Sequence, residues 1–205
     1  MSAQERKERE RANRHQLIVS TARELAEAQG WDAVTTRKLA ERIEYSQPVL
    51  YSHFRGKREI LGAVALEGMA ELTAALRAAV AEQPAGRPAV AALAHAYTDF
   101  ATGSPALYDA MFSLDNGLPF AAETTPAPLR EAFQALLDPL VAHAGPDEEP
   151  GLFVETFWAA LHGLITLTRV GRLPADRIPS RITLLVNRFV GTEELVGTEE
   201  QPPVQ

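Results

Sequence analysis

The apolar residues of this chain recur every three to four positions almost from end to end, and this spacing predicts an all-α fold. Ile18, Ala22 and Leu25, for example, fall on one face of a helix. No segment of useful length alternates apolar and polar residues as a half-buried strand does. Prolines and glycines lie mostly between the periodic segments, where helices end. We expect about nine helices, arranged as a small three-helix N-terminal head and a larger helical body.

Capping residues and helix breakers set the expected limits of these helices. Thr35 and Ser46 are good N-caps, and Gly30 is expected to end the first helix. Pro48 suits the first turn of the short helix that follows Ser46. The helix at 151–170 is apolar on nearly all sides, which predicts burial on all of its faces. The expected helices are 13–29, 36–43, 47–54, 57–82, 88–101, 105–114, 129–143, 151–170 and 175–190.

Charge is distributed unevenly along the chain. The net charge of the 205 residues is −7, which by itself argues against a nucleic-acid partner. Residues 1–58, however, hold 12 Lys and Arg against 8 Asp and Glu, whereas residues 59–205 hold 8 against 19. This asymmetry predicts a basic binding head on an acidic body.

The sequence also excludes several classes of chemistry. There is no cysteine, so disulfides, thiolate nucleophiles and cysteine metal sites are excluded, and a reducing cytoplasm fits this composition. The N-terminal sequence MSAQERKERERANRHQ lacks the apolar segment of a secretory signal. No run of ~18 apolar residues occurs, so we expect no membrane span and no membrane partner.

The segment TTRKLAERIEYSQPVLYSHFRGKREIL, residues 35–61, predicts two helices joined by a short turn. Leu50 and Phe54 are spaced to pack the second helix against the first. The outward face is then polar and aromatic, which suits the major groove of DNA, where Gln pairs with adenine and valine contacts a thymine methyl group. The alternative is a compact three-helix subdomain without a binding role. The residues left for the groove and its walls are Gln47, Val49, Tyr51, Ser52 and His53.

These residues resemble the DNA-binding head of tetracycline-repressor (TetR) family regulators. The matching motif is T-T-R-K-L-A, then S-Q-P-V-L-Y-S-H-F, then Lys57, and the resemblance covers about residues 13–61. It implies that four residues mainly hold phosphates, namely Thr36, Tyr51, His53 and Lys57. It implies that four others face bases, namely Arg37, Gln47, Pro48 and Val49.

Two positions depart from the family pattern. Glu44 occupies the turn position where the family usually has glycine, and a positive φ there costs a non-glycine residue roughly 1–2 kcal/mol. Val49 stands where the prototype has a polar residue, so the operator preference does not carry over. We therefore expect the fold of the head, but not its preferred DNA sequence, to follow the family.

The body carries a second resemblance. Trp158-x-x-x-His162-Gly163 is similar to a Trp-x3-His-Gly signature in one group of the family's C-terminal domains. Trp158 and His162 share a helix face and are expected to line a ligand cavity. Alternatively, both side chains belong to the core and Gly163 permits close helix packing. The candidate ligand-binding residues are Tyr97, Phe100, Phe112, Phe153, Trp158 and His162.

Four segments are expected. Alternating Arg and Glu indicate a flexible arm at 1–12, and the composition of 191–205 indicates a disordered tail. Between them the resemblance implies a helix-turn-helix domain at 13–58 and a ligand-binding and dimerisation domain at 59–190. It also implies a homodimeric repressor, in which the last two helices pair with their mates and a near-palindromic operator is bound. A small effector, apolar or aromatic, would release the operator.

Two alternatives remain: an activator or a regulator without a small ligand, and, in a different class, a small helical enzyme centred on His162. No phosphate loop, nucleophile elbow or paired-carboxylate motif supports the enzyme. The family's namesake holds its drug with a magnesium ion, but His95, His143 and His162 lack metal-type spacing, so we expect no metal and no cofactor.

Overall fold

The computed structural model describes residues 2–191, and every regular element within that range is helical. Three short 3-10 turns, at Trp31–Ala33, Val141–His143 and Ala175–Arg177, accompany the α-helices. The all-α prediction and the expected number of helices are confirmed for the described residues, whereas the tail predicted at 191–205 lies outside them apart from Gly191, which caps α9. The α-helices are α1 (Ala3–Gln29), α2 (Thr36–Arg42), α3 (Gln47–Tyr51), α4 (Lys57–Ala81), α5 (Arg87–Gly103), α6 (Pro105–Phe112), α7 (Ala127–Leu140), α8 (Pro150–Arg169) and α9 (Ile178–Val190).

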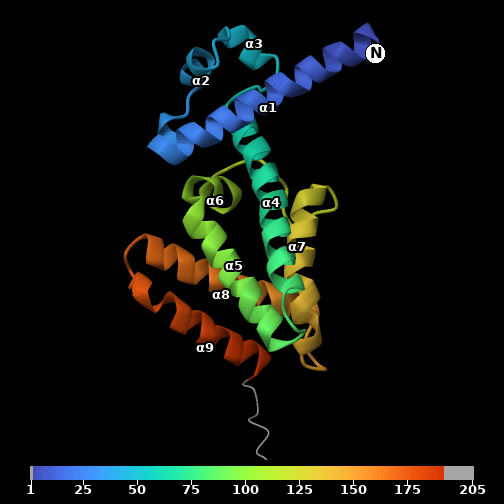
Figure 1. Cartoon of the computed structure of the whole chain (residues 1–205), viewed down its shortest axis with the longest axis vertical. Coiled ribbons are helices and arrows are strands. Elements are labelled where there is room, and N and C mark those ends of the chain that lie inside the picture. Colours follow the sequence, from blue (N-terminus) through green and yellow to red (C-terminus); the bar gives the residue numbers. More distant parts are fainter. Residues whose placement is uncertain (1, 192–205) are drawn as a thin grey trace, which may run out of the picture.

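Helix α4 joins the two parts of the molecule. Helices α1 to α3 form the head at one end of α4, and α5 to α9 form the body around the rest of it (Figure 1). Helix α4 packs against α1 in the head and against α5, α6 and α7 in the body. One continuous hydrophobic core runs through both parts, from Ile18 in α1 to Val186 in α9.

The first helix is longer than the sequence pattern predicts. It begins at Ala3 rather than near residue 13, so from Ala3 onward the segment expected to be a flexible arm is helical. Ser2 and Glu5 form a reciprocal capping box, in which each side chain accepts a hydrogen bond from the other residue's backbone N–H. Residues 2–17 are exposed, so local capping rather than burial holds this extension.

Helix α8 is not buried on all faces, and that prediction is wrong for a single chain. Its buried residues are Val154, Phe157, Leu161 and Ile165, which face α5, α7 and α9. On the other side Leu152 is 61% exposed, because no helix of the same chain covers it. Among the described residues α8 alone is long and apolar enough to span a membrane, yet its inner face belongs to the core of the body.

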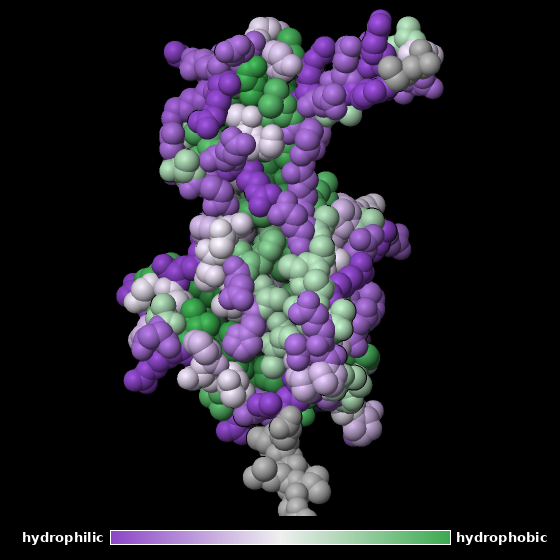
Figure 2. All heavy atoms as spheres, in the orientation of Figure 1, coloured by the Kyte–Doolittle hydropathy of each residue, from purple (hydrophilic) through white to green (hydrophobic). Residues whose placement is uncertain are grey.

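The surface of the molecule reflects the same division. In the view of Figure 2 the head and the projecting end of α1 are covered mainly by hydrophilic residues, while hydrophobic atoms reach the surface over the body. Leu167 of α8, Val170 directly after α8 and Leu184 of α9 are among the exposed large apolar residues. Helices α8 and α9 thus carry apolar surface that one chain does not bury.

Candidate DNA-binding and ligand-binding sites

The turn between α2 and α3 has the geometry that the sequence predicts. Thr35 Oγ1 accepts a hydrogen bond from the backbone N–H of Lys38 at 3.2 Å and so caps α2. Glu44 adopts a positive φ of 58°, the left-handed conformation expected where the family usually has glycine. Ser46 is the N-cap residue of α3, although its side chain makes no capping bond, and Pro48 lies in the first turn.

Helix α3 is shorter than predicted but is packed as predicted. It ends at Tyr51 instead of Phe54, and the chain turns through Ser52 and His53. Leu50 and Phe54 are both buried, so they fix the inner side of this segment on the head. Among the candidate groove residues, Tyr51 is half exposed, Gln47, Pro48 and Ser52 are exposed, and Val49 and His53 are partly exposed.

The candidate phosphate residues surround this exposed face. The hydroxyl groups of Thr36 and Tyr51 lie 3.4 Å apart, which brings α2 and α3 together at one edge. Arg37 is exposed and pairs with Glu41 on the same helix at 2.9 Å, a pairing that leaves its remaining donors free. Lys57 is partly buried and donates one hydrogen bond to the carbonyl oxygen of Trp31.

His53 is placed so that it stays largely neutral. Burial lowers its pKa, and the nearby His15, Arg11 and Arg14 lower it further. A neutral imidazole retains one N–H donor and can still bind a phosphate oxygen. The nine candidate DNA-binding residues thus lie in α2, α3, the turn after α3 and the first turn of α4, and all of them are exposed or partly exposed.

The body contains a cavity of about 840 Å³, a volume in the range of drug-sized ligand sites. Helices α4 to α8 and the loop before α7 surround it. Of the six candidate ligand-binding residues, Tyr97, Phe112 and Trp158 line this cavity. The remaining lining residues are Met69, Leu72, Phe120, Ala121, Ala122, Thr125, Leu129, Arg130, Ala132, Phe133, Gln134, Leu136, Glu155 and Ala159.

The other three candidates lie outside the lining of this cavity. Phe153 packs against Phe189 of α9 with ring centroids 5.2 Å apart, and Phe100 packs against the core from α5. His162 stacks on Tyr108 behind the cavity wall. Trp158 and His162 lie near each other on α8, with ring centroids 6.3 Å apart, but only Trp158 lines the cavity.

Four side chains form a hydrogen-bonded chain along this wall. The indole N–H of Trp158 donates to the Tyr97 hydroxyl at 2.8 Å, the two tyrosine hydroxyl groups lie 2.9 Å apart, and the Tyr108 hydroxyl lies 2.6 Å from Nδ1 of His162. Because indole can only donate, every hydroxyl proton finds an acceptor only if Tyr97 donates to Tyr108 and Tyr108 donates to His162.

This direction requires a neutral His162 with an unprotonated Nδ1. Burial, together with the nearby Arg169, lowers the pKa of His162, which is consistent with that state. Burial also raises the pKa of Tyr97 to about 12, so its hydroxyl keeps its proton. Tyr108, which the sequence interpretation missed, connects the cavity wall to His162; only its position in α6, far from α8 in sequence, makes this connection.

Helix α6 also contacts the head directly. Both carboxylate oxygens of Glu27 in α1 accept backbone N–H groups of α6, from Ala106 at 3.1 Å and from Leu107 at 2.9 Å. The indole of Trp31 donates to the carbonyl oxygen of Ala106 at 2.7 Å. On the other side of α6, Arg169 of α8 holds Asp109 through two hydrogen bonds of 2.8 Å. Helix α6 thus connects the head with the cavity wall.

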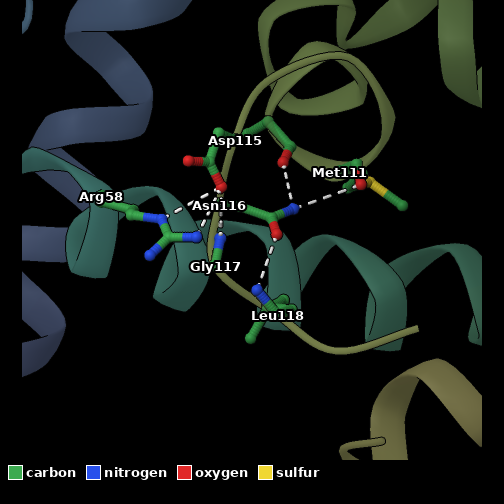
Figure 3. A network of polar contacts seen from close by, with 7 residues as sticks. Arg58, Met111, Asp115, Asn116, Gly117 and Leu118 are labelled. Atoms are coloured by element: carbon green, nitrogen blue, oxygen red, sulfur yellow. Dashed lines mark hydrogen bonds and ion pairs between the residues drawn. The ribbon is translucent and has the colours of Figure 1, made fainter. Parts of the chain in front are cut away.

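A second joint lies where α4 enters the body (Figure 3). Arg58 donates to Asp115 through two hydrogen bonds of 3.0 and 2.8 Å, and this contact lowers the pKa of Asp115. The amide of Asn116 donates to the Ala110 carbonyl oxygen at 2.8 Å. A Cβ on Gly62 would lie 2.8 Å from the carbonyl oxygen of Asn116, so glycine is needed for this close approach of the loop to α4.

Comparisons with known proteins agree with this division into head and body. Residues 18–64 match the family described as bacterial regulatory proteins of the tetR family. Residues 90–189 match the family described as the tetracyclin repressor-like C-terminal domain.

The chain is also similar to individual transcriptional regulators and to a solved structure. The chain is 34% identical over 94 residues to the uncharacterized HTH-type transcriptional regulator YobS of Bacillus subtilis, covering 46% of this chain and 49% of that one. It is 48% identical over 54 residues to the class A tetracycline repressor of Escherichia coli, covering 26% and 25%. A solved Rhodococcus protein of unknown function is 26% identical, with a TM-score of 0.72 over 85% of this chain and 92% of that chain. The matches therefore span about half or less of the length of these two regulators.

Proposed function

Because the chain belongs to the tetracycline-repressor (TetR) family of transcriptional regulators and has a helix-turn-helix head, we propose that it is a cytoplasmic repressor. In this proposal it binds a near-palindromic DNA operator as a homodimer and is released by a small, apolar or aromatic ligand. The observation that carries the proposal is the exposed face of α3, held in place by buried Leu50 and Phe54. The proposal assigns no catalytic role to the protein.

The charge and geometry of the head support DNA as the partner. Residues 1–58 are net basic in an acidic chain, which favours approach to phosphates and orients the head toward them. Gln47 and Val49 lie on α3, and the major groove of DNA is wide enough to admit an α-helix. Thr36 and Lys57 would then lie at the edges of the groove. In the groove Gln47 would read adenine, while the flanking residues hold the backbone.

Dimerisation is supported by the uncovered apolar surface of the last two helices. Leu152 and Leu167 of α8, Val170 directly after α8 and Leu184 of α9 are exposed in one chain. Pairing α8 and α9 with the same helices of a second copy would cover them in a four-helix bundle with twofold symmetry. Two heads related by that symmetry would read two half-sites of an operator.

Ligand release is supported by the position of the cavity beside α6. A ligand that binds the released state more tightly than the DNA-bound state shifts the equilibrium between the two states. Phe112 and Tyr97 line the cavity, and α6 is hydrogen-bonded to Glu27 and Trp31 of the head. A ligand that displaces α6 would therefore displace the head as well.

The test is a gel-shift titration with an operator selected from random DNA by the full-length protein. Gln47→Ala and Tyr51→Ala are each expected to raise the operator Kd about tenfold or more, because a good base or phosphate contact contributes about 1–3 kcal/mol. Gln83→Ala, an exposed glutamine after α4 and outside the head, is the matched control and should leave Kd unchanged. Unchanged affinity in both head variants would refute the assignment of α3 as the reading helix.

A further inference from the structure

We propose that the cavity of the body takes a lipophilic organic cation, held by the Glu155 carboxylate and by aromatic ring faces. This inference rests on the proposed ligand-binding function and specifies the chemical class of the ligand. Its basis is that aromatic rings and one unpaired, solvent-exposed carboxylate line the same half-open cavity.

Aromatic side chains dominate the shape of the cavity. Five of the seventeen lining residues are aromatic, and they come from four helices and the loop before α7. Ring faces carry negative electrostatic potential and attract cations, most strongly where water is excluded. A flat or multi-ring apolar molecule with a delocalised positive charge would gain both burial and this attraction. The five rings belong to Tyr97, Phe112, Phe120, Phe133 and Trp158.

Glu155 supplies the counter-charge. It is the one carboxylate of the lining, and it makes no hydrogen bond or ion pair with any residue of the described part of the chain. It precedes Trp158 and Ala159 by three and four positions on α8, so all three side chains lie on one helix face toward the cavity. The Glu155 carboxylate is solvent-exposed and no residue of the described part of the chain pairs with it, whereas a bound cation would.

The one cation of the lining, Arg130, has a structural role instead. Its guanidinium donates to the carbonyl oxygen of Thr125, while the Thr125 hydroxyl accepts the backbone N–H of Ala122 at 2.9 Å. Arg130 thus holds the loop before α7 in place. The surrounding body is also acidic, with 8 Lys and Arg against 15 Asp and Glu in residues 59–191. Both features favour a cationic over an anionic ligand.

Two probes of the same shape and opposite charge test the inference: tetraphenylphosphonium and tetraphenylborate, titrated into the full chain by calorimetry in a sodium buffer. We expect tetraphenylphosphonium to bind and tetraphenylborate to bind at least tenfold more weakly. Glu155→Gln should weaken tetraphenylphosphonium binding roughly five- to tenfold, as expected for one partly solvated charge contact. The matched control is Glu131→Gln, an exposed glutamate of α7 outside the lining, which should bind like the original chain.

Three results would overturn the inference: tighter binding of the anion, equal affinity of Glu155→Gln and the original chain for tetraphenylphosphonium, or binding of neither probe. Melting curves of both variants establish that they fold. Operator gel shifts with each probe separate the two proposals. Release of the operator by tetraphenylborate alone would support the proposal of a ligand-released repressor and would contradict the proposal of a cationic ligand.

Discussion

Replacing Glu27 by alanine is expected to weaken the joint between the head and helix α6. The Glu27 carboxylate accepts the N–H groups of Ala106 and Leu107, at 3.1 and 2.9 Å. Both belong to the first turn of α6, where N–H groups have no acceptor within the helix. Loss of a capping acceptor costs about 1 kcal/mol, and loss of a negative charge beside a helix N-terminus costs about 0.3–1 kcal/mol more. We therefore expect a loss of about 1–2 kcal/mol in the free energy of unfolding.

In a chain of this length, 1 kcal/mol corresponds to about 2–4 °C in Tm, so Glu27→Ala should melt about 2–8 °C below the original chain. The assay is thermal unfolding followed by circular dichroism at fixed protein concentration. The control is Glu24→Ala, one turn earlier on α1, because the pair between Glu24 and Arg42 is solvent-exposed and 3.9 Å long. That variant should lose no more than about 0.5 kcal/mol. Equal melting temperatures for the two variants would refute the capping role of Glu27.

Three further results are expected. Gly68→Ala should lower the free energy of unfolding by about 1–3 kcal/mol, because its Cβ would lie 2.6 Å from the sulfur of Met111. Gly163→Ala is the control: a Cβ there meets nothing within 4 Å in one chain, so this variant should be neutral or stabilising in monomers. Equal losses in the two variants would contradict the packing of α4 on α6. His162→Asn retains an acceptor for Tyr108 but cannot titrate. The folded-state pKa of His162 lies below 6.5, so its contribution to folding stability is complete above that pH and is lost as the pH falls. The Tm of the variant should therefore decline less steeply than that of the original chain between about pH 7 and about pH 5. Lys57→Gln should weaken binding to all DNA sequences alike and should reduce the slope of log affinity against log salt concentration by about one per head. A loss of affinity for only some sequences would instead assign Lys57 to base reading.

Much of the head could be predicted from short windows of sequence. The caps at Thr35 and Gly30, the inner pair Leu50 and Phe54, and the left-handed turn at Glu44 are all observed. These features depend on hydrogen bonds and side-chain contacts within about four residues, so their determinants are contiguous in the chain. The same reasoning missed the extension of α1 to Ala3, because apolar periodicity does not register a polar helix end held by capping and solvent-exposed pairs.

The cavity could be predicted only in part. Tyr97, Phe112 and Trp158 were identified as aromatic residues on apolar helix faces and line the cavity, whereas Phe153 and Phe100, chosen by the same criterion, pack outside its lining. Local periodicity tells which side of a helix faces inward, but it does not tell whether that side meets another helix or a space between helices.

The sequence by itself determined the helical class, the position of the helix-turn-helix with its short helix α3, and the basic character of the head. Tertiary structure alone decided which residues enclose the cavity, that Tyr108 meets His162 across 54 positions, and that Glu27 caps α6 across 79. The reason is that helices form through contacts between near neighbours in the chain, whereas a cavity and its connection to the head are properties of the space left when helices from distant segments pack together.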